Sequence, residues 1–464
     1  MRRSSWTKAL VAVATLSLCA ALAACGTRQE TRDGRTITVW SLENLTERIT
    51  ATQRAVDRFT EQTGIQVKLV GVDENQLGQL IMSSAAAGRL PDVIGAVPLA
   101  AVRQMAANDL LDTEVPRQVV QDLDPTTFNP RALELTRDGG QQLAVPSDAW
   151  AQLLVYRKDL FAKAGLPEPA TYQDIERAAR TLHATGIHGI SLATDPGDVF
   201  TQQTFEYLAL ANGCQLVDSS GRVQLDSPAC RRTFSLYGDL ATRYSAVGTQ
   251  TVESTRATYF SGGSAMIIWS SMLLDELAGL RNDVLPSCPE CRDDPTWLAR
   301  NSGVVTAIRG PDGQAPAQFG EMTSWVITRT ANTEASRAFV HFMLDEGYQD
   351  WFGMAPEGKF PVRSGTPEDP TRFQRVWESL QAGVDTRRPL AEIYPAEVID
   401  QLRSGLDRMQ RWGITQGQGA LVGATTGELP VPRAIGALAS GQLDAAEAAE
   451  QAHEDVTAIQ QSLQ

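Results

Sequence analysis

Residues 36–72 read TITVWSLENLTERITATQRAVDRFTEQTGIQVKLVGV, and two different periodicities alternate within them. The first five residues alternate between apolar and polar positions as a strand does. Residues 46–63 then place Ile49, Val56 and Phe59 on one helical face, and Gly64 follows where helices commonly stop. IQVKLVGV at residues 65–72 alternates again. We therefore predict a strand, a helix and a second strand.

The same order continues downstream. Residues 75–88 place Leu77, Leu80 and Ile81 on one helical stripe, and PDVIGA at residues 91–96 has the character of a third strand. A β-α-β-α-β series predicts the start of an open α/β sheet. Ligands bind such sheets beyond the carboxyl ends of the strands, so the loop SLENL after Trp40 is a candidate binding loop.

Three later sectors also carry structural signals. A second sector begins at residues 142–169, continues through helical segments after Thr171 and includes the strand-like SAMIIWSS at residues 264–271. Residues 323–346 predict a strand followed by a helix with Ala338, Phe339, Phe342 and Met343 facing inward. The tail from Glu392 onward is helical and rich in alanine. A glycine-rich passage interrupts it, and we expect its GQGALVG run, residues 417–423, to be a loop.

The amino-terminus has the features of an export signal. Arg2, Arg3 and Lys8 precede an uncharged apolar segment, residues 9–24, which is shorter than the roughly 20 residues that a membrane-spanning helix needs. The following LAAC resembles the lipobox of bacterial lipoproteins, which implies that Cys25 receives a diacylglyceryl group and becomes the new amino-terminus. An ordinary signal peptide with a chance cysteine is the alternative. We expect residues 1–24 to be the signal and residues 25–35 a lipidated tether to the membrane.

Charge and length restrict the function further. Loss of the signal removes three cations and lowers the formal net charge from −14 to −17, which disfavours nucleic acid as a partner. No later stretch is apolar for long enough to span a bilayer. The remaining chain of about 430 residues is long for one core, so two domains or lobes are expected.

Four cysteines remain after the signal and the anchor, and four cysteines allow three pairings. We favour Cys214 with Cys230 and Cys288 with Cys291, because the first pair brackets a hairpin-like segment. CPEC at residues 288–291 has two other interpretations, a redox dithiol and half of a zinc site. Both lack the sequence context they need, since no strand-to-helix turn, second dithiol or nearby histidine accompanies the motif. We expect no metal and no cofactor.

Several blocks together resemble one family, the extracellular solute-binding proteins of ABC importers, and in particular its maltose-binding-protein-like sugar binders. The blocks are ITVW, FTEQTGIQVKL with GRLPDVIG, LAVPSDAWAQLLVYRKDLFAKAGL, YFSGGSAMIIWSS, and NTEASRAFVHFML followed by EGKFPVR. They occur in the family's order over most of residues 36–365. Arg157 stands where the family usually has asparagine, and the glycine-rich residues 413–427 are a larger departure whose role stays open.

The resemblance implies an α/β, two-lobed periplasmic-binding-protein-like fold with a hinge and an interlobe ligand cleft. Lobe one would contain residues 36–147 and 301–345, and lobe two residues 148–300 and 346–464. The implied function is capture of a mono- or oligosaccharide outside the membrane and its delivery to ABC permease subunits by lobe closure. Such a protein would be a monomer held to the cell membrane by its lipid, with no catalytic turnover.

Other functions stay open. Family members also bind glycerophosphodiesters and polyols. A lipid-anchored hydrolase would need a nucleophile with a base or a pair of carboxylates, and neither Gly-x-Ser-x-Gly nor His-Glu-x-x-His occurs in the sequence. An adhesion or scaffold lipoprotein would show no ligand-dependent closure.

Sugars present apolar faces and hydroxyl edges, so a sugar site needs aromatic rings and planar polar groups. The matching blocks offer eleven candidates: Glu43, Asn44, Asp148, Trp150, Trp269, Ser270, Ser271, Gly358, Lys359, Phe360 and Arg363. Lys359 or Arg363 would suit an anionic group on the ligand. Trp269 has a core position as its alternative, and Trp40 is expected in the core.

Overall fold

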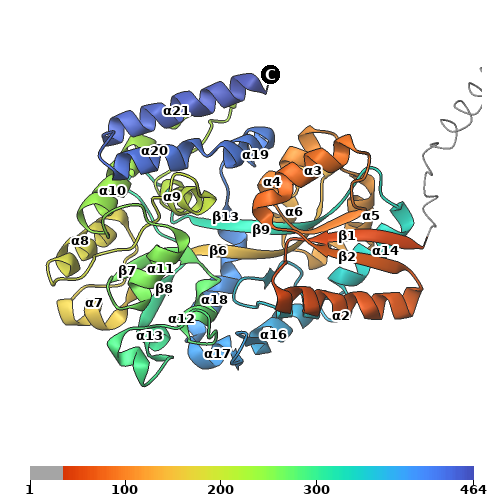
Figure 1. Ribbon diagram of the computed structural model, residues 1–464, viewed down its shortest axis with the longest axis horizontal. Helices are drawn as coiled ribbons and strands as arrows, with labels where there is room; N and C mark the ends of the chain where they lie inside the picture. The colour runs from red at the N-terminus through yellow and green to blue at the C-terminus, as the bar shows by residue number, and fades with distance from the viewer. Residues whose placement is uncertain (1–34, 464) are drawn as a thin grey trace, which may run out of the picture.

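The computed structural model describes residues 35–463, so the predicted signal, Cys25 and most of the predicted tether lie outside the described residues. Its centre is a nine-stranded mixed sheet (Figure 1), whose main path runs β10-β6-β9-β3-β1-β2. These strands are β1 (Thr36–Ser41), β2 (Gln66–Gly71), β3 (Val93–Pro98), β6 (Val145–Arg157), β9 (Gln318–Ile327) and β10 (Phe360–Pro361).

The amino-terminal β-α-β-α-β unit has the predicted form. β1 lies between β2 and β3 and is parallel to both. The helix α2 (Thr46–Thr63) ends at Gly64, whose φ of 72° is in the left-handed region, and α3 (Leu77–Ala86) buries Leu77 and Ile81. Because the three strands are parallel, their carboxyl ends meet at one edge of the sheet.

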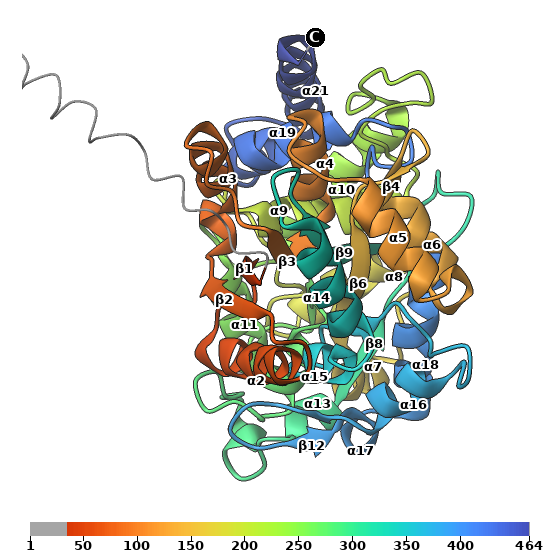
Figure 2. The same ribbon diagram turned by 90° about the vertical axis from the view of Figure 1, so that its right-hand side faces the viewer.

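More helices cover this half of the sheet. They are α4 (Leu99–Ala107), α5 (Glu114–Asp122), α6 (Pro130–Leu135) and α14 (Thr333–Leu344), with the short turns η1 (Glu74–Gln76) and η2 (Pro125–Thr127) and the hairpin of β4 (Arg137–Asp138) and β5 (Gln141–Gln142) between them. Figure 2 shows β1 and β2 on one side of the molecule and α5 and α6 on the other. In α14, the predicted inward residues Phe339, Phe342 and Met343 are buried and Ala338 is partly buried.

A single long strand joins the two halves of the molecule. β6 pairs antiparallel with β9 over residues 145–151, and then with β7 (Met266–Ser270) and β8 (Ser302–Val305) over residues 152–157. Around these later pairs lie α7 (Lys158–Ala164), α8 (Tyr172–His183), α9 (Val199–Ala211), α10 (Pro228–Arg243), α11 (Val252–Phe260), α12 (Leu273–Leu277), η3 (Pro289–Arg292) and α13 (Trp297–Arg300). Most of these helices form the left half of Figure 1.

The carboxyl-terminal segment returns to the centre before it ends on that left half. It contains α15 (Tyr348–Gly353), α16 (Arg372–Ser379), β11 (Gln381–Ala382), β12 (Arg388–Pro389), α17 (Leu390–Ile393), α18 (Ala396–Gly405), η4 (Leu406–Arg408), β13 (Met409–Gln410), α19 (Gly419–Glu428), α20 (Pro430–Ala439) and α21 (Ala445–Ser462). β13 pairs parallel with β9, so this late segment reaches the central sheet.

The prediction that residues 417–423 form a loop is wrong for most of that run, because α19 begins at Gly419. α19 packs against α4 of the other half. A Cβ on Gly419 would lie 2.5 Å from Arg103 Cδ, and one on Gly423 would lie 3.0 Å from the Ala100 carbonyl oxygen. The glycines therefore permit close approach of two helices and do not mark a loop.

The predicted disulfides are both present, Cys214 with Cys230 and Cys288 with Cys291. The first encloses the antiparallel bridge between Val217 and Val223, which confirms the expected hairpin-like segment. Within residues 35–463, no helix combines the length and the apolar character needed to cross a membrane.

Candidate functional site

The carboxyl end of β1 points toward the left half of the molecule in Figure 1, and β3 runs parallel to β1. Glu43 lies two residues beyond β1, and α4 begins directly after β3. The groups that meet these ends come from β6, β9, α9, the segment around Lys359 and the segment around Arg411. We refer to this region as the lobe interface.

Three of the predicted site residues form one buried ionic cluster there. Lys359 Nζ lies 2.6 Å from Glu43 Oε1 and 2.9 Å from Asp148 Oδ2, and the Lys359 side chain is 0% exposed. Trp351 Nε1 donates to Asp148 Oδ1 at 2.6 Å, and the lysine also lies over the Trp351 ring at 4.4 Å. The sequence prediction thus brings together Glu43, Asp148 and Lys359, although they lie up to 316 positions apart in the chain.

The cluster is held in its charged form. Burial would raise the pKa of Glu43, but Lys359 and Arg48 outweigh that effect and lower the pKa to about 2. Burial would likewise lower the pKa of Lys359, but Asp148 and Glu43 raise it. Because both sides of the pair are stabilised as ions, the contact is an ion pair at neutral pH.

A second group of acids lies beside this cluster. Arg48 Nη1 donates to Glu43 Oε2 at 2.7 Å, and its Nη2 lies 3.9 Å from Met272 Sδ. Met272 also packs against Gly358, where a Cβ would lie 1.9 Å from the sulfur, so only glycine fits at that position. Glu357 precedes this glycine, and Asp275 follows Met272 by three residues.

A third group surrounds Arg411. Its Nε lies 3.2 Å from Glu206 Oε1, and its Nη1 donates to Glu321 Oε2. Glu321 Oε1 also accepts from the backbone N–H of Leu99 at 3.1 Å, at the first turn of α4, where a carboxylate complements the helix dipole. The three charged side chains thus link α9, β9, α4 and the segment that follows β13.

Trp150 is a partly exposed aromatic side chain beside these charged groups. It lies opposite Glu321 in the pairing of β6 with β9, so the two side chains share one face of the sheet. Its ring centroid is 5.8 Å from that of Phe319, and the Arg411 guanidinium lies 4.8 Å from the Phe319 ring centroid. A flat apolar surface therefore adjoins buried charged groups.

Trp269, by contrast, is 5% exposed and packs edge-on against Phe200, with ring centroids 4.6 Å apart. The structure therefore places it in the core, which is the alternative that the sequence left open. Ser270 is half-buried, and Ser271 is fully buried, with its N–H donating to the Ala151 carbonyl at 2.8 Å. Trp40 is partly buried against the smaller of two apolar clusters.

The remaining candidates lie apart from the charged groups. Asn44 is exposed, and Phe360 is buried with its ring edge-on to Trp377 at 5.5 Å. Arg363 is 1% exposed, and its guanidinium donates to Thr127 Oγ1 and to the carbonyl oxygens of Leu123 and Leu344. Its hydrogen bonds tie two segments together, so in this structure it does not present its charge to a ligand.

Sequence reasoning missed Glu206, Glu321 and Arg411. A signal for two of them exists, because Glu206 stands alone in the apolar helix VFTQQTFEYLALA and Glu321 stands alone in the strand QFGEMTSWVI. A lone carboxylate in an apolar element is rarely buried unless it is paired. Arg411 carried no such signal, since only the fold brings residue 411 to residue 206.

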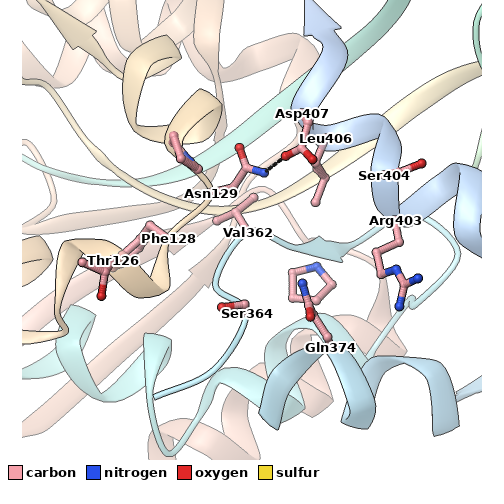
Figure 3. Close-up of a pocket in the computed structure, with 12 residues that line it drawn as sticks. Thr126, Phe128, Asn129, Val362, Ser364, Gln374, Arg403, Ser404, Leu406 and Asp407 are labelled. Carbon is pink, nitrogen blue, oxygen red and sulfur yellow. Dashed lines mark hydrogen bonds between the residues drawn. The ribbon is translucent and has the colours of Figure 1, made fainter. Parts of the chain in front are cut away.

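A cavity of about 370 Å³ lies elsewhere (Figure 3). Its walls come from the η2–α6 segment, the chain around β10, α16 and the end of α18, and they include Phe128, Val362, Gln374 and Arg403. Asn129 Nδ2 donates to Asp407 Oδ1 across it at 2.6 Å. The eleven predicted ligand-binding residues are absent from this wall. Over the described part of the chain, no group of three or more His, Cys, Asp or Glu side chains could hold a metal ion.

The lobe interface carries groups of the kinds found in binding sites for polar compounds. The carboxylates and cations there are buried and paired with one another, whereas Trp150 keeps part of its ring exposed and packs on the buried Phe319. Such a combination recognises a polar ring compound, with its hydroxyls on the charged groups and its C–H face on the rings.

The chain is similar in sequence to known proteins. A family model described as bacterial extracellular solute-binding protein matches residues 43–350. A putative ABC transporter periplasmic-binding protein of Escherichia coli K12, YcjN, is 29% identical over 362 residues, which cover 76% of this chain and 78% of the relative.

Solved structures show the same fold. The GacH receptor of Streptomyces glaucescens, solved without ligand and with acarbose, has a TM-score of 0.68 at 21% identity and covers 91% of this chain and 98% of its own. A sugar transporter protein of Arthrobacter chlorophenolicus with bound laminaribiose has a TM-score of 0.69 at 16% identity, covering 91% and 99%. At these identities the likeness concerns the fold, which is the two-lobed α/β fold expected from sequence.

Proposed function

Because the chain belongs to the family of bacterial extracellular solute-binding proteins, we propose that it captures a mono- or oligosaccharide and delivers it to an ABC permease. The general role, that of the substrate-binding component of an ABC transporter, follows from the family and from the Escherichia coli relative, independently of the ligand. Two structural neighbours carry acarbose and laminaribiose, which supports a carbohydrate as the ligand class.

The observation that carries the carbohydrate assignment is the pairing of Trp150 with Glu321. A partly exposed indole and a buried carboxylate face the same side of the sheet, at the edge where β1 and β3 end. A sugar ring needs both kinds of contact, one for its C–H face and one for its hydroxyls. Of the eleven predicted contacts, Trp150, Glu43, Asp148 and Lys359 lie in this region, and they remain our candidates.

Lobe closure is the mechanism that fits the contacts. With lobe one as residues 36–147 and 301–345, the ion pairs Glu43–Lys359 and Glu321–Arg411 each join the two lobes. A ligand that touches both lobes binds the closed state better than the open state, and this difference in affinity drives closure. The permease would then recognise the closed form.

The amino-terminal features complete the proposal. Residues 1–24 act as the export signal, and acylated Cys25 holds a monomer at the outer face of the cell membrane through residues 25–35. Two acyl chains give a stable anchor, because each buried methylene contributes about 0.8 kcal/mol. The protein has no catalytic turnover in this role.

A thermal-shift panel of mono- and disaccharides, ribitol and sn-glycero-3-phosphodiesters tests the ligand class. A true ligand at 100 times its Kd adds about 2.7 kcal/mol to the free energy of unfolding. We expect a sugar to raise the Tm, with a smaller response from Trp150→Ala. A rise with a glycerophosphodiester and none with sugars would replace the carbohydrate assignment, and chemical change of the bound compound would show an enzyme.

A further inference from the structure

The cations at the lobe interface are already committed to carboxylates of the chain. Lys359 is held by Glu43 and Asp148, Arg411 by Glu206 and Glu321, and Arg48 by Glu43. Arg256 Nη1 lies 3.0 and 3.1 Å from the two carboxylate oxygens of Glu276. An anionic ligand would have to displace one of these partners and leave a buried carboxylate unpaired, which is costly.

Two carboxyl groups beside these pairs have no such partner. Glu357 is 3% exposed and Asp275 is 2% exposed, and neither forms an ion pair within residues 35–463. The Oε2 atom of Glu357 is buried and has no hydrogen-bond partner in the described chain. An unsatisfied buried carboxyl oxygen is rare in folded proteins and points to a ligand that donates a hydrogen bond to it.

The position of these two groups connects them to the lobe interface. Glu357 is separated from Lys359 only by Gly358, and Gly358 packs on Met272. The sulfur of Met272 also contacts the guanidinium of Arg48, which belongs to α2. Asp275 lies one turn beyond Met272. Both carboxyls raise the pKa of Arg48, the partner of Glu43, so they lie near the Glu43–Lys359 contact, whose residues are among the proposed ligand contacts.

We propose that Asp275 and Glu357 form an acidic subsite, so that the protein takes neutral and amino-bearing sugars and rejects sugar acids and sugar phosphates. The inference rests on the proposed function and adds the charge of the ligand to it. An ammonium group, or a hydroxyl as donor, satisfies the free oxygen of Glu357, and the ammonium group also favours the ionised form of the pair. A carboxylate or phosphate disfavours that form and meets cations that are already paired.

Without a ligand, the surroundings of the pair favour its protonated form. Burial and the neighbours Glu357 and Glu276 raise the pKa of Asp275 to about 8. Burial raises the pKa of Glu357 to about 7, against the opposing effects of its own backbone N–H, Arg48 and Arg281. Arg281 is hydrogen-bonded to Asp283, and it lowers the pKa of both carboxyls without forming an ion pair with either in the described chain. The Tyr394 hydroxyl donates to the Leu274 carbonyl.

The test compares four compounds that share one sugar ring and differ in charge: D-glucose, D-glucosamine, D-glucuronate and D-glucose 6-phosphate. The corresponding galactose compounds are measured in parallel. Isothermal titration calorimetry on the wild-type protein gives Kd for each. We expect the amine to bind several-fold more tightly than its parent, and the acid and phosphate at least tenfold more weakly than the parent. In two buffers of different ionisation enthalpy, the amine should release protons from the pair and the parent sugar should not.

A variant assigns the effect to the subsite. In Glu357→Gln the preference for the amine over the parent sugar should fall toward one, while Glu334→Gln, on the exposed face of α14, should retain it. An acid or phosphate that binds as tightly as its parent, or a preference unchanged in Glu357→Gln, overturns the charge rule alone. Absence of binding by every compound in both series, together with no response to the disaccharides of the thermal-shift panel, overturns the carbohydrate assignment as well.

Discussion

Two tryptophans show how burial separates a core residue from a contact residue. Trp269 and Trp150 both lie in or beside strands of the central sheet, and both matched the sugar-binding pattern in the sequence. Trp269 is enclosed by Phe200 and lies 5.7 Å from the Arg256 guanidinium, whereas Trp150 keeps part of its ring exposed beside Phe319. The same residue type therefore serves stability at one position and is available for binding at the other.

We expect Trp269→Ala to lower the free energy of unfolding by about 3–5 kcal/mol, because it leaves a cavity in the core. Trp150→Ala should leave the urea midpoint nearly unchanged and weaken ligand binding about tenfold. Chemical denaturation and calorimetry of both variants measure the two effects. A Trp269→Ala protein of normal stability with weakened binding would return that residue to the site.

The ion pair of Glu43 predicts sensitivity to acid. Its pKa is about 2 in the folded protein against 4.5 ordinarily, so its stabilising effect is complete above pH 4.5 and is lost as the pH falls toward 2. The contribution is about 3 kcal/mol. The urea midpoint should decrease as the pH is lowered from 6 to 2.5, and it should decrease less steeply in Glu43→Gln. Equal slopes in the two proteins would contradict the assignment.

At the scale of elements, the contact of α19 with α4 depends on missing side chains. Gly419 and Gly423 lie one turn apart and face α4, whereas a Cβ on Gly427, one turn further, would meet no atom within 4 Å. Arg103 of α4 is buried against Gly419, and its Nη2 donates to the carbonyl oxygens of Leu135 and Arg137. The contact between the two helices thus buries Arg103 away from water, and the two carbonyl oxygens replace water as hydrogen-bond acceptors for its guanidinium.

The matched substitutions Gly419→Ala and Gly427→Ala test this packing. Gly419→Ala should destabilise the protein by about 1–3 kcal/mol through overpacking against Arg103. Gly427→Ala should be neutral or stabilise by up to about 1 kcal/mol, because alanine favours the helix. Thermal unfolding of the two proteins gives the comparison, and equal effects would show that close approach is not the reason for these glycines.

The two disulfides should differ in their contribution to stability. The Cys214–Cys230 bond spans 16 positions and the Cys288–Cys291 bond spans 3. In the loop-entropy model the longer loop gains about 3 kcal/mol and the shorter one less. The double variants Cys214→Ser/Cys230→Ser and Cys288→Ser/Cys291→Ser should therefore lower the Tm to different extents, measured by calorimetry, and the reverse order would argue against loop entropy as the cause.

For the whole molecule, the lobe contacts predict a change of shape on ligand binding. The interface in this structure is closed by ion pairs between segments that the proposed bounds assign to different lobes. Without ligand these charges gain hydration when the lobes separate, so an open state is accessible. Small-angle scattering should show a smaller radius of gyration with saturating ligand than without, and no change with a non-binding sugar at equal concentration. An unchanged radius would contradict closure.

The local pattern of the sequence determined the β-α-β-α-β unit and the strand-helix pair of residues 323–346, because burial on one face imposes a period of 2 on a strand and 3.6 on a helix. It also favoured the disulfide pairs that form, and its blocks carried the resemblance to the family. The tertiary structure alone decided that Trp269 is core, that residues 419–423 are helix, and that Arg411 meets Glu206 and Glu321. These outcomes depend on which distant segments touch, since burial and charge pairing are properties of neighbours in space that no local period encodes.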